Sequence, residues 1–319
     1  MTESPIHRHH LLILSQHSKV YDQIITRAKL PGLSISTAAN PKQAEGSAGD
    51  CDILFGEPSL ISSVLNQLHK VRWVQATWAG VEALLVAGMR HDYILTNARN
   101  VYGLMLSEYV FGYLITIERG ILHRWQAQLD GRWENETPGT LRNKHLGLLG
   151  VGSIGAHLAL SAHLLGMVVF GYTRQSETCD YVDQYLHGDE WRDFASGLDY
   201  LVCTLPATPS TKNLINADFL SALPERTWLV NIGRGCTLDE TALVNNLRNG
   251  SLAGAVLDVT KEEPLPPGHP LWSTPNTFLT FHTAARNHPP DIASIFIDNY
   301  QRYIKGKPLK YRVDFTQGY

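Results

Sequence analysis

The chain has 319 residues, which at roughly 150 residues per domain predicts two domains. Hydrophobic residues make up 44% of the sequence and charged residues 18%, as in packed globular proteins, which excludes a disordered chain. Lys and Arg total 27 against 30 Asp and Glu, so the net charge is −3. The chain therefore lacks the excess of positive charge that would favour binding to nucleic acid or to anionic lipid.

The distribution of apolar residues predicts neither membrane insertion nor secretion. The longest apolar stretch, residues 158–170, is interrupted by His163 and Gly166 and falls short of the ~20 residues that a spanning helix needs. The apolar run at residues 11–14 is too short for a secretory signal. The four cysteines are scattered and form no C-x-x-C pair, so the sequence indicates neither a zinc site nor a disulfide framework. They are Cys51, Cys179, Cys203 and Cys236. We therefore expect a soluble, reduced, cytoplasmic protein.

Short apolar runs alternate with helical patterns along the whole chain, and this βαβ rhythm predicts parallel sheets covered by helices. In the first hundred residues we expect strands at residues 11–15, 51–55, 71–77 and 93–96. Apolar residues recur at helical spacing within residues 59–70. These elements are enough for a small doubly wound unit.

The second part of the chain predicts a larger unit of the same kind. A long helical pattern, first apolar and then amphipathic, covers residues 104–129. Strands are then expected at residues 145–150, 167–173, 200–205, 227–232, 253–258 and 277–281. The amphipathic tail at residues 289–305 has no strand after it, and we expect it to pack on the first domain. The predicted fold class is α/β, with two doubly wound parallel-sheet domains.

A glycine fingerprint joins the strand at residues 145–150 to the following helix. It reads G-V-G-S-I-G, and its candidate cofactor residues are Gly150, Gly152, Ser153, Ile154 and Gly155. Gly150 would allow the tight turn, Gly152 would let the backbone approach a pyrophosphate, and Gly155 would let the helix pack on the strand. The phosphates would lie at the helix N-terminus, where N–H groups and the macrodipole favour an anion. A glycine-rich turn without a ligand is the alternative interpretation.

The end of the strand at residues 167–173, the second strand of the predicted dinucleotide-binding unit, indicates which dinucleotide is used. Dinucleotide-binding folds place an acid there to hold the ribose 2′-hydroxyl, but this chain reads Thr173, Arg174, Gln175, Ser176. A hydroxyl and an arginine suit a 2′-phosphate, because Arg makes charge-assisted contacts and no acid repels the phosphate. We therefore expect NADPH to be preferred, with NADH also accepted. The alternative is that Arg174 is a solvated loop residue.

Three further segments follow at predicted strand ends: N-I-G-R-G at residues 231–235, L-D-V with E-E-P-L-P at residues 257–266, and L-T-F-H-T-A-A at residues 279–285. With the fingerprint, they resemble the D-isomer-specific 2-hydroxyacid dehydrogenase family. The segments E-P-L-P-P at residues 263–267 and P-L-W at residues 270–272 look most like its glyoxylate/hydroxypyruvate reductases. The resemblance implies a Rossmann-type dinucleotide-binding domain at residues 99–285. Residues 1–98 and 286–319 would form a discontinuous, flavodoxin-like substrate-binding domain.

The same resemblance implies that Arg234, Glu263 and His282 are the catalytic residues. Arg234 would bind the carboxylate of a 2-keto acid and polarise its carbonyl through a planar fork of donors. His282 would supply the proton that the developing alkoxide needs. Glu263 would favour the imidazolium and fix the orientation of the ring. The alternatives are a surface arginine, a solvated acid and a buried structural histidine.

Two features depart from a simple match to the family. Most relatives carry Pro before the catalytic histidine, whereas this chain has Phe281, which puts the local backbone shape in question. Glu262 stands next to Glu263, so the sequence leaves open which carboxylate faces His282.

Other site residues follow from the resemblance alone. Asp258 resembles the acid that holds the nicotinamide carboxamide. Further cofactor contacts are expected at Leu205, Pro206, Thr211, Ile232, Gly233 and Ala284. The substrate carboxylate is expected at a loop of the first domain, together with Arg234 and His282; the loop consists of Trp78, Ala79, Gly80 and Val81. Gly80 is the informative residue there, because a missing Cβ lets the main chain approach a ligand closely. A plain strand-to-helix turn is the alternative for this loop.

The expected function is reduction of glyoxylate, hydroxypyruvate or a similar small 2-keto acid to the D-2-hydroxy acid by hydride transfer from NADPH, without a metal ion. The partners expected are this small substrate and a second copy of the chain, with no nucleic acid and no membrane. The homodimer interface would include residues 109–117 and the arm around Trp125 and Trp133. One alternative is a formate or phosphite dehydrogenase of the same fold, although the Glu263–His282 pair argues against formate. Another is a nucleotide-sensing protein similar to the C-terminal-binding corepressors.

Overall fold

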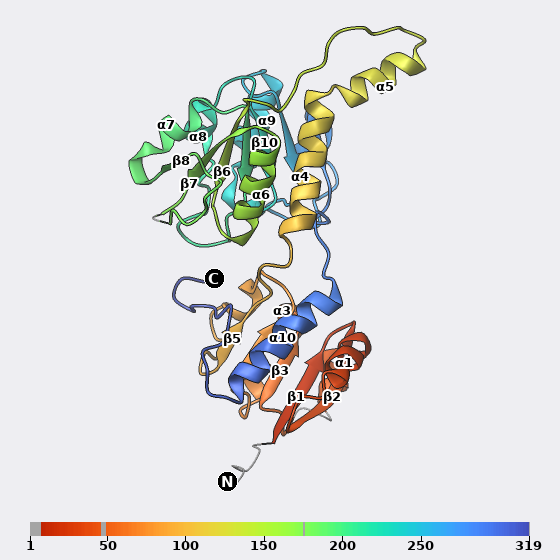
Figure 1. Ribbon diagram of the computed structural model, residues 1–319, viewed down its shortest axis with the longest axis vertical. Helices are drawn as coiled ribbons and strands as arrows, with labels where there is room; N and C mark the ends of the chain where they lie inside the picture. The colour runs from red at the N-terminus through yellow and green to blue at the C-terminus, as the bar shows by residue number, and fades with distance from the viewer. Residues whose placement is uncertain (1–7, 46–48, 175, 319) are drawn as a thin grey trace. The chain divides into compact units, whose positions relative to one another are not determined.

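The computed structural model describes residues 8–45, 49–174 and 176–318 (Figure 1). The chain divides into two compact units. Unit 1 consists of Met1–Val101 and Asn287–Tyr319, and unit 2 of Tyr102–Arg286. Unit 2 is thus one continuous segment, whereas unit 1 is assembled from both ends of the chain.

A parallel five-stranded sheet forms the centre of unit 1 (Figure 1). Its order is β2-β1-β3-β4-β5, which is the flavodoxin-like order of a doubly wound sheet. The strands are β1 (His9–Leu14), β2 (Leu33–Ala38), β3 (Ile53–Gly56), β4 (Trp73–Ala76) and β5 (Ile94–Thr96). The helices are α1 (Ser18–Arg27), α2 (Pro41–Ala44), α3 (Pro58–Ser62) and α10 (Pro289–Tyr303), with 3₁₀ turns η1 (Leu65–Gln67) and η2 (Glu82–Leu84).

Side chains alternate between the two faces of this sheet along each strand, and both faces are buried. On β4, the ring of Trp73 stacks on Phe296 of α10, with the ring centroids 5.1 Å apart. The alternate residues Val74 and Ala76 belong to an apolar cluster that includes Ile61 of α3. The C-terminal helix α10 is therefore part of the core of unit 1.

Unit 2 is built on a parallel seven-stranded sheet. Its order is β12-β11-β10-β9-β6-β7-β8; counting β6 as the first strand, this is the Rossmann order 3-2-1-4-5-6 with a seventh strand at the edge. The strands are β6 (His145–Leu149), β7 (Val168–Tyr172), β8 (Gln184–Leu186), β9 (Tyr200–Cys203), β10 (Trp228–Asn231), β11 (Gly254–Leu257) and β12 (Thr277–Leu279). The two parallel-sheet units confirm the predicted fold class.

Helices cover both faces of this sheet (Figure 1). Leu201 of β9 packs in a cluster with Leu243 of α9, whereas its neighbour Val202 packs in a second cluster with Val110 of α4 and Leu158 of α6. The helices are α4 (Gly103–Glu118), α5 (Ile121–Leu129), α6 (Ser153–Leu164), α7 (Trp191–Ala195), α8 (Ala217–Ala222) and α9 (Glu240–Arg248). Three 3₁₀ turns are η3 (Gly188–Glu190), η4 (Gly235–Thr237) and η5 (Pro270–Ser273). Helix α5 projects from the body of the unit (Figure 1).

The structure adds elements that the sequence pattern did not predict. The strands β2 and β8 lie at the edges of their sheets, where short or half-exposed segments give no continuous apolar run. The helical pattern at residues 104–129 is divided into α4 and α5 at Gly120, whose φ of 58° is left-handed and ends α4. Within the described parts of the chain, no helix combines the length and apolarity needed to cross a membrane.

Candidate active site

The carboxyl ends of five parallel strands of unit 2 bring most of the predicted site residues to one edge of the sheet. Gly150 follows β6, Thr204 follows β9, Ile232 follows β10, Asp258 follows β11 and Thr280 follows β12. The chain runs to one side of β6 and then to the other, and ligands of doubly wound sheets bind where the order reverses in this way. The Thr204 hydroxyl donates to the carbonyl of Gly150 (2.9 Å), which ties together the loops at this point.

The glycine fingerprint has the geometry that its three glycines predict. Gly150 has a φ of 93°, a left-handed conformation that favours glycine. A Cβ on Gly155 would lie 2.3 Å from the carbonyl oxygen of Gly150, so only glycine lets α6 pack this closely. Gly152 is the N-cap of α6, and apart from its immediate chain neighbours and the backbone of α6 no described atom lies within 4 Å of where its Cβ would stand. The first turn of α6, which contains Ser153 and Ile154, thus has open space before it.

The loop after β7 is organised by its own hydrogen bonds. The Thr173 hydroxyl donates to the carbonyl of Ser176 (2.8 Å), so its proton is used within the loop. The side chains of Arg174 and Ser176 are exposed, while Gln175 lies outside the described residues. His187, which follows β8, donates from Nδ1 to the carbonyl of Thr173 (2.9 Å). The loop that carries Arg174 is therefore fixed by a side chain from the neighbouring strand.

Asp258 is the acceptor at the centre of a small network. Its Oδ1 atom accepts hydrogen bonds from the Thr280 hydroxyl (2.7 Å) and from the N–H groups of Thr283 (2.8 Å) and Ala284 (3.0 Å). Thr280 has a single hydroxyl proton, so the Tyr109 hydroxyl, 2.7 Å from Thr280 Oγ1, must be the donor in that contact. Burial raises the pKa of Tyr109, which keeps it protonated as this role requires.

Glu263 and His282 form a direct pair. The Nδ1 atom of His282 lies 2.8 Å from Oε2 of Glu263, and the side chains are 45% and 38% exposed, respectively. The other carboxylate oxygen, Oε1, accepts the N–H of Thr260 (3.0 Å), which holds the carboxylate in place. Because a carboxylate only accepts, the proton of a neutral His282 is on Nδ1, and Nε2 faces outward from the pair. Glu263, and not Glu262, is the acid bonded to the ring.

The loop that carries Arg234 touches the loop that carries Glu263. A Cβ on Gly235 would lie 2.0 Å from both the carbonyl carbon and the carbonyl oxygen of Thr260, so the two loops touch at Gly235. The Arg234 side chain is half-buried and donates from Nη1 to the carbonyl of Gly233 (2.8 Å). The structure thus brings the Arg234 loop, Glu263 and His282 together at one edge of the sheet.

Phe281 gives the backbone before the histidine a conformation that proline cannot adopt. Phe281 and His282 both have a φ of 58°, whereas the ring of proline fixes φ near −65°. The N–H of His282 donates to the carbonyl of Asp258 (2.6 Å), which anchors this turn. The Phe281 ring packs against Trp272, with the centroids 5.6 Å apart. The departure from the family pattern therefore corresponds to a particular left-handed turn.

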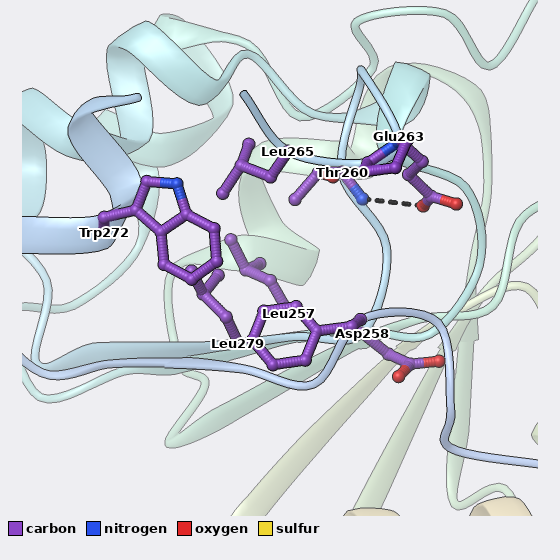
Figure 2. A pocket seen from close by; sticks show the side chains of 9 residues that line it. Leu257, Asp258, Thr260, Glu263, Leu265, Trp272 and Leu279 are labelled. Atoms are coloured by element: carbon purple, nitrogen blue, oxygen red, sulfur yellow. Dashed lines mark hydrogen bonds between the residues drawn. The ribbon is translucent and has the colours of Figure 1, made fainter. Parts of the chain in front are cut away.

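A cavity of about 470 Å³ lies beside the acidic residues (Figure 2). Figure 2 shows Trp272 and three leucines around it, while the carboxylates of Asp258 and Glu263 point away from the apolar side chains. The lining residues are Leu257, Asp258, Thr260, Glu263, Pro264, Leu265, Trp272, Leu279 and Phe281. The two carboxylates are thus on the polar side of an otherwise apolar wall.

The remaining predicted cofactor residues lie on the adjoining loops or beneath them. The hydroxyl of Thr211 donates to the carbonyl of Pro206 (2.6 Å), which closes the loop that follows β9. Gly233 approaches this loop closely, since a Cβ there would lie 2.6 Å from the carbonyl oxygen of Leu205. Ile232 and Ala284 are buried in the apolar cluster beneath the sheet edge.

The predicted substrate loop belongs to unit 1. Its carbonyls at Trp78 and Ala79 accept the Ala98 N–H (3.1 Å) and the Asn97 side-chain amide (2.8 Å), respectively. In a trans peptide, the next N–H points opposite to the carbonyl, so the N–H groups of Ala79 and Gly80 point away from these donors. The Trp78 side chain is 49% exposed, whereas Val81 is buried in the core of the unit.

Two groups near the predicted residues could not be found from the sequence. Glu177 accepts a hydrogen bond from Nε2 of His187 (2.7 Å) beside Thr173. Tyr109, which the apolar pattern suggested as interface, instead bonds Thr280. The first contact joins residues ten apart in sequence and the second joins residues 171 apart, and no spacing rule signals either of them.

Comparisons with known proteins show which family the chain resembles in sequence and fold. A sequence profile described as "D-isomer specific 2-hydroxyacid dehydrogenase, NAD binding domain" matches residues 111–284. A crystal structure of a D-isomer specific 2-hydroxyacid dehydrogenase family protein from Aeromonas salmonicida is 38% identical, covers 97% of this chain and 99% of its own, and has a TM-score of 0.91. A D-isomer specific 2-hydroxyacid dehydrogenase from Xanthobacter autotrophicus, solved with NADPH and MES, is 30% identical, covers 98% and 100% of the two chains, and has a TM-score of 0.89. The glyoxylate/hydroxypyruvate reductase A of Salmonella heidelberg is 28% identical over 258 residues, which are 79% of this chain and 83% of that protein.

The fold, the site and these matches define the class: an oxidoreductase with a nicotinamide-cofactor domain and a second α/β domain. The chain belongs to the D-isomer specific 2-hydroxyacid dehydrogenase family. The resemblance inferred from the motifs is thereby confirmed, including the similarity to the glyoxylate/hydroxypyruvate reductases.

Proposed function

We propose that the protein reduces a small 2-keto acid of the glyoxylate or hydroxypyruvate type to the D-2-hydroxy acid, with NADPH as the preferred hydride donor. The observation that carries the proposal is the pair of Glu263 and His282, 2.8 Å apart, next to Asp258 at the carboxyl edge of a Rossmann-type sheet. The name of the Salmonella relative supports this substrate class. The Xanthobacter structure with NADPH supports the cofactor.

We assign the pyrophosphate of a dinucleotide to the first N–H groups of α6, because Gly152 leaves the backbone at this end of the helix unobstructed. We assign the nicotinamide carboxamide to Oδ2 of Asp258, since three donors already converge on Oδ1. The bound nicotinamide supplies the hydride for C2 of the substrate. The 2′-phosphate is assigned to Arg174 and Ser176, with Thr173 shaping the loop rather than donating to the phosphate.

The protein's own residues would then bind the substrate carboxylate, stabilise the developing charge and supply the proton. Arg234 binds the substrate carboxylate and polarises the carbonyl. In its imidazolium form, His282 donates the proton on Nε2 to the oxygen that gains charge and is left neutral, with its remaining proton on Nδ1. Glu263 stabilises the imidazolium from the Nδ1 side, and its bond to the Thr260 N–H prevents the carboxylate from turning away. The N–H groups of Ala79 and Gly80 are assigned to the substrate carboxylate.

The test follows NADPH absorbance with glyoxylate and hydroxypyruvate as substrates, with the configuration of the product determined by chiral chromatography. His282→Ala and Arg234→Ala should each remove most of the turnover while the variants remain folded. His163→Ala and Arg248→Ala are matched controls, because both side chains are exposed on helices of unit 2. Formate or phosphite oxidation, nucleotide binding without turnover, or near-normal activity of Arg234→Ala would contradict the proposal.

We also propose that the protein is a homodimer, as the family resemblance implies. Within residues 109–117, Val110, Phe111 and Leu114 are buried in the core of unit 2, so this stretch offers less surface than the sequence suggested. The exposed apolar side chains are concentrated on α5 and the arm after it, where Trp125 is 57% and Trp133 is 95% exposed. Sedimentation at micromolar protein should give the dimer mass, and a monomer would contradict the assignment.

A further inference from the structure

A buried carboxylate outside the predicted motifs contacts the segment that carries Glu263. Glu240 is the first residue of α9, and its side chain is only 10% exposed. Its Oε1 atom accepts the backbone N–H of Lys261 (2.6 Å), and its Oε2 atom lies 3.6 Å from Nε2 of His269. Lys261 lies near the start of the segment between β11 and η5, and His269 is the last residue of that segment. One carboxylate therefore contacts both ends of the segment.

The surroundings of Glu240 explain why a carboxylate is stable in this buried position. A buried acid needs partners, and the N–H of Lys261 supplies a short hydrogen bond to it. The N–H of Leu271 donates to Nδ1 of His269 (3.3 Å), so the proton of the neutral ring is on Nε2 and faces Glu240. The first turn of α9 also carries the partial positive charge of a helix N-terminus. Glu240 is thus held in place as an acceptor.

Residues 260–263 form a turn whose internal hydrogen bonds set its shape. The N–H of Thr260 donates to Oε1 of Glu263 (3.0 Å), and the Thr260 hydroxyl donates to the carbonyl of Glu262 (2.8 Å). These bonds close the turn on itself and orient the Glu263 carboxylate within it. They do not fix the turn to the rest of unit 2, because both partners of each bond belong to the turn.

The attachment of this turn to the rest of unit 2 depends on a few contacts. Among the described residues, the side chains outside the turn that hydrogen-bond it are Glu240 and His282. The close approach of Gly235 to the turn limits how near the two loops can come, but a steric contact cannot hold them together. The hydrogen bond from Lys261 to Glu240 is therefore the contact that fixes the turn to α9.

This attachment determines where the acid of the Glu263–His282 pair lies. Without it, the turn can shift and carry Glu263 away from Nδ1 of His282, which lies 2.8 Å from the carboxylate in the structure. Asp258 precedes the turn and keeps the three donors that converge on its Oδ1 atom. Loss of the attachment should therefore affect the acid–histidine pair and spare the aspartate that we assign to the cofactor.

We propose that Glu240 is a positioning residue for the reduction: from the first turn of α9 it holds the turn at residues 260–263 and thereby keeps Glu263 against His282. This inference rests on the function proposed above. Glu240 contacts neither the substrate nor the cofactor in this assignment, and it acts through the backbone of Lys261.

The experiment separates the reach of the side chain from its charge. Glu240→Gln keeps an oxygen at the same distance without the charge, Glu240→Asp keeps the charge on a side chain that is one methylene shorter, and Glu240→Ala removes both. Leu247→Ala is the matched control for stability, because Leu247 is buried near the other end of α9 and belongs to the apolar cluster of that face.

Three measurements are made on each full-length variant. Hydrogen–deuterium exchange followed by mass spectrometry reports the protection of a peptide covering residues 259–267. Steady-state rates of NADPH oxidation with glyoxylate and hydroxypyruvate give kcat and the KM for NADPH. Thermal unfolding gives the melting temperature, so that a loss of activity can be compared between variants of equal stability.

We expect Glu240→Ala to lower kcat about tenfold or more, because a misplacement of 1 Å costs about a hundredfold in rate. The KM for NADPH should stay within about twofold, and exchange in residues 259–267 should become faster because the Lys261 N–H loses its acceptor. Glu240→Gln should recover most of kcat and of the protection, whereas Glu240→Asp should resemble Glu240→Ala. Leu247→Ala should lower the melting temperature but keep kcat within about threefold of the wild type.

Several results would overturn the inference and leave the proposed function intact. One is a wild-type kcat in Glu240→Ala, and another is a loss of kcat no greater than that of Leu247→Ala. Recovery by Asp and not by Gln would show that the charge at the start of α9 matters and the bond to Lys261 does not. If Glu240→Ala fails to fold, the comparison of Gln with Asp decides. A wild type that reduces neither keto acid would contradict the proposed function and the inference together.

Discussion

Replacing Gly235 by alanine should disconnect Arg234 from the acid–histidine pair. The new Cβ would lie 2.0 Å from the carbonyl carbon and oxygen of Thr260, whereas ordinary contact begins at 3.4 Å, so the Thr260 peptide must retreat by about 1.4 Å. Thr260 holds Glu263 through its N–H (3.0 Å), and Glu263 in turn holds His282 (2.8 Å). A misplacement of 1 Å costs about a hundredfold in rate, so we expect kcat/KM to fall by about that factor or more.

The assay is the initial rate of NADPH oxidation with glyoxylate at saturating cofactor, together with urea unfolding. Forced repacking costs about 1–3 kcal/mol, so the free energy of unfolding should decrease by that amount while the protein stays folded. Gly197→Ala is the matched control, because apart from its immediate chain neighbours the only described atom within 4 Å of its Cβ position is Nδ1 of His145, at 3.7 Å. Activity of Gly235→Ala within threefold of the control would refute the coupling between the two loops.

Three further changes test neighbouring parts of the site. Glu263→Gln keeps a hydrogen-bonding partner for His282 but removes the charge that stabilises the imidazolium, so kcat should fall at least tenfold with little change in KM for the cofactor. Tyr109→Phe removes the donor to the Thr280–Asp258 network, and KM for the cofactor should rise about threefold to tenfold while kcat changes little, as steady-state kinetics would show. Phe281→Pro cannot adopt a φ of 58°, so both the melting temperature and kcat/KM should fall, whereas Phe281→Gly should keep the melting temperature close to that of the wild type.

Each of these expectations can fail in a distinct way. If Glu263→Gln kept the wild-type kcat, the negative charge of Glu263 would not contribute to catalysis. A fall in kcat alone in Tyr109→Phe would show that the network acts on the reacting atoms and not on the cofactor. An unchanged melting temperature in Phe281→Pro would show that the left-handed turn is not required for the fold.

Much of the candidate site can be predicted from the sequence because functional residues of a doubly wound sheet lie at the carboxyl ends of its strands. Each motif directly follows an apolar run, so the order of motifs along the chain predicts that Gly150, Asp258 and His282 meet at one edge, as the structure shows. The fold class follows from the same alternation, because a strand buried on both faces leaves a compact apolar run between helical patterns.

What the sequence did not predict depends on contacts between distant segments. The short edge strand β8 carries no strong pattern, and without it nothing places His187 beside Thr173. The identity of the acid that faces His282 also required coordinates, since Glu262 and Glu263 are chemically alike. The left-handed turn at Phe281 is a third example, because the sequence shows the missing proline but not the backbone conformation that replaces it.

The convergence of three donors on one oxygen of Asp258 constrains how this site can evolve. Asparagine has nearly the same shape, but its carbonyl oxygen would have to serve Thr280, Thr283 and Ala284, which turns its amide donors towards the side assigned to the cofactor. The reverse orientation would place amide protons against three donors and release the turn that carries His282. Asparagine at this position therefore loses either the acceptor on the side assigned to the cofactor or the hydrogen bonds that hold the turn. Aspartate meets both demands, so we expect divergence in this architecture to occur in the loops around Asp258.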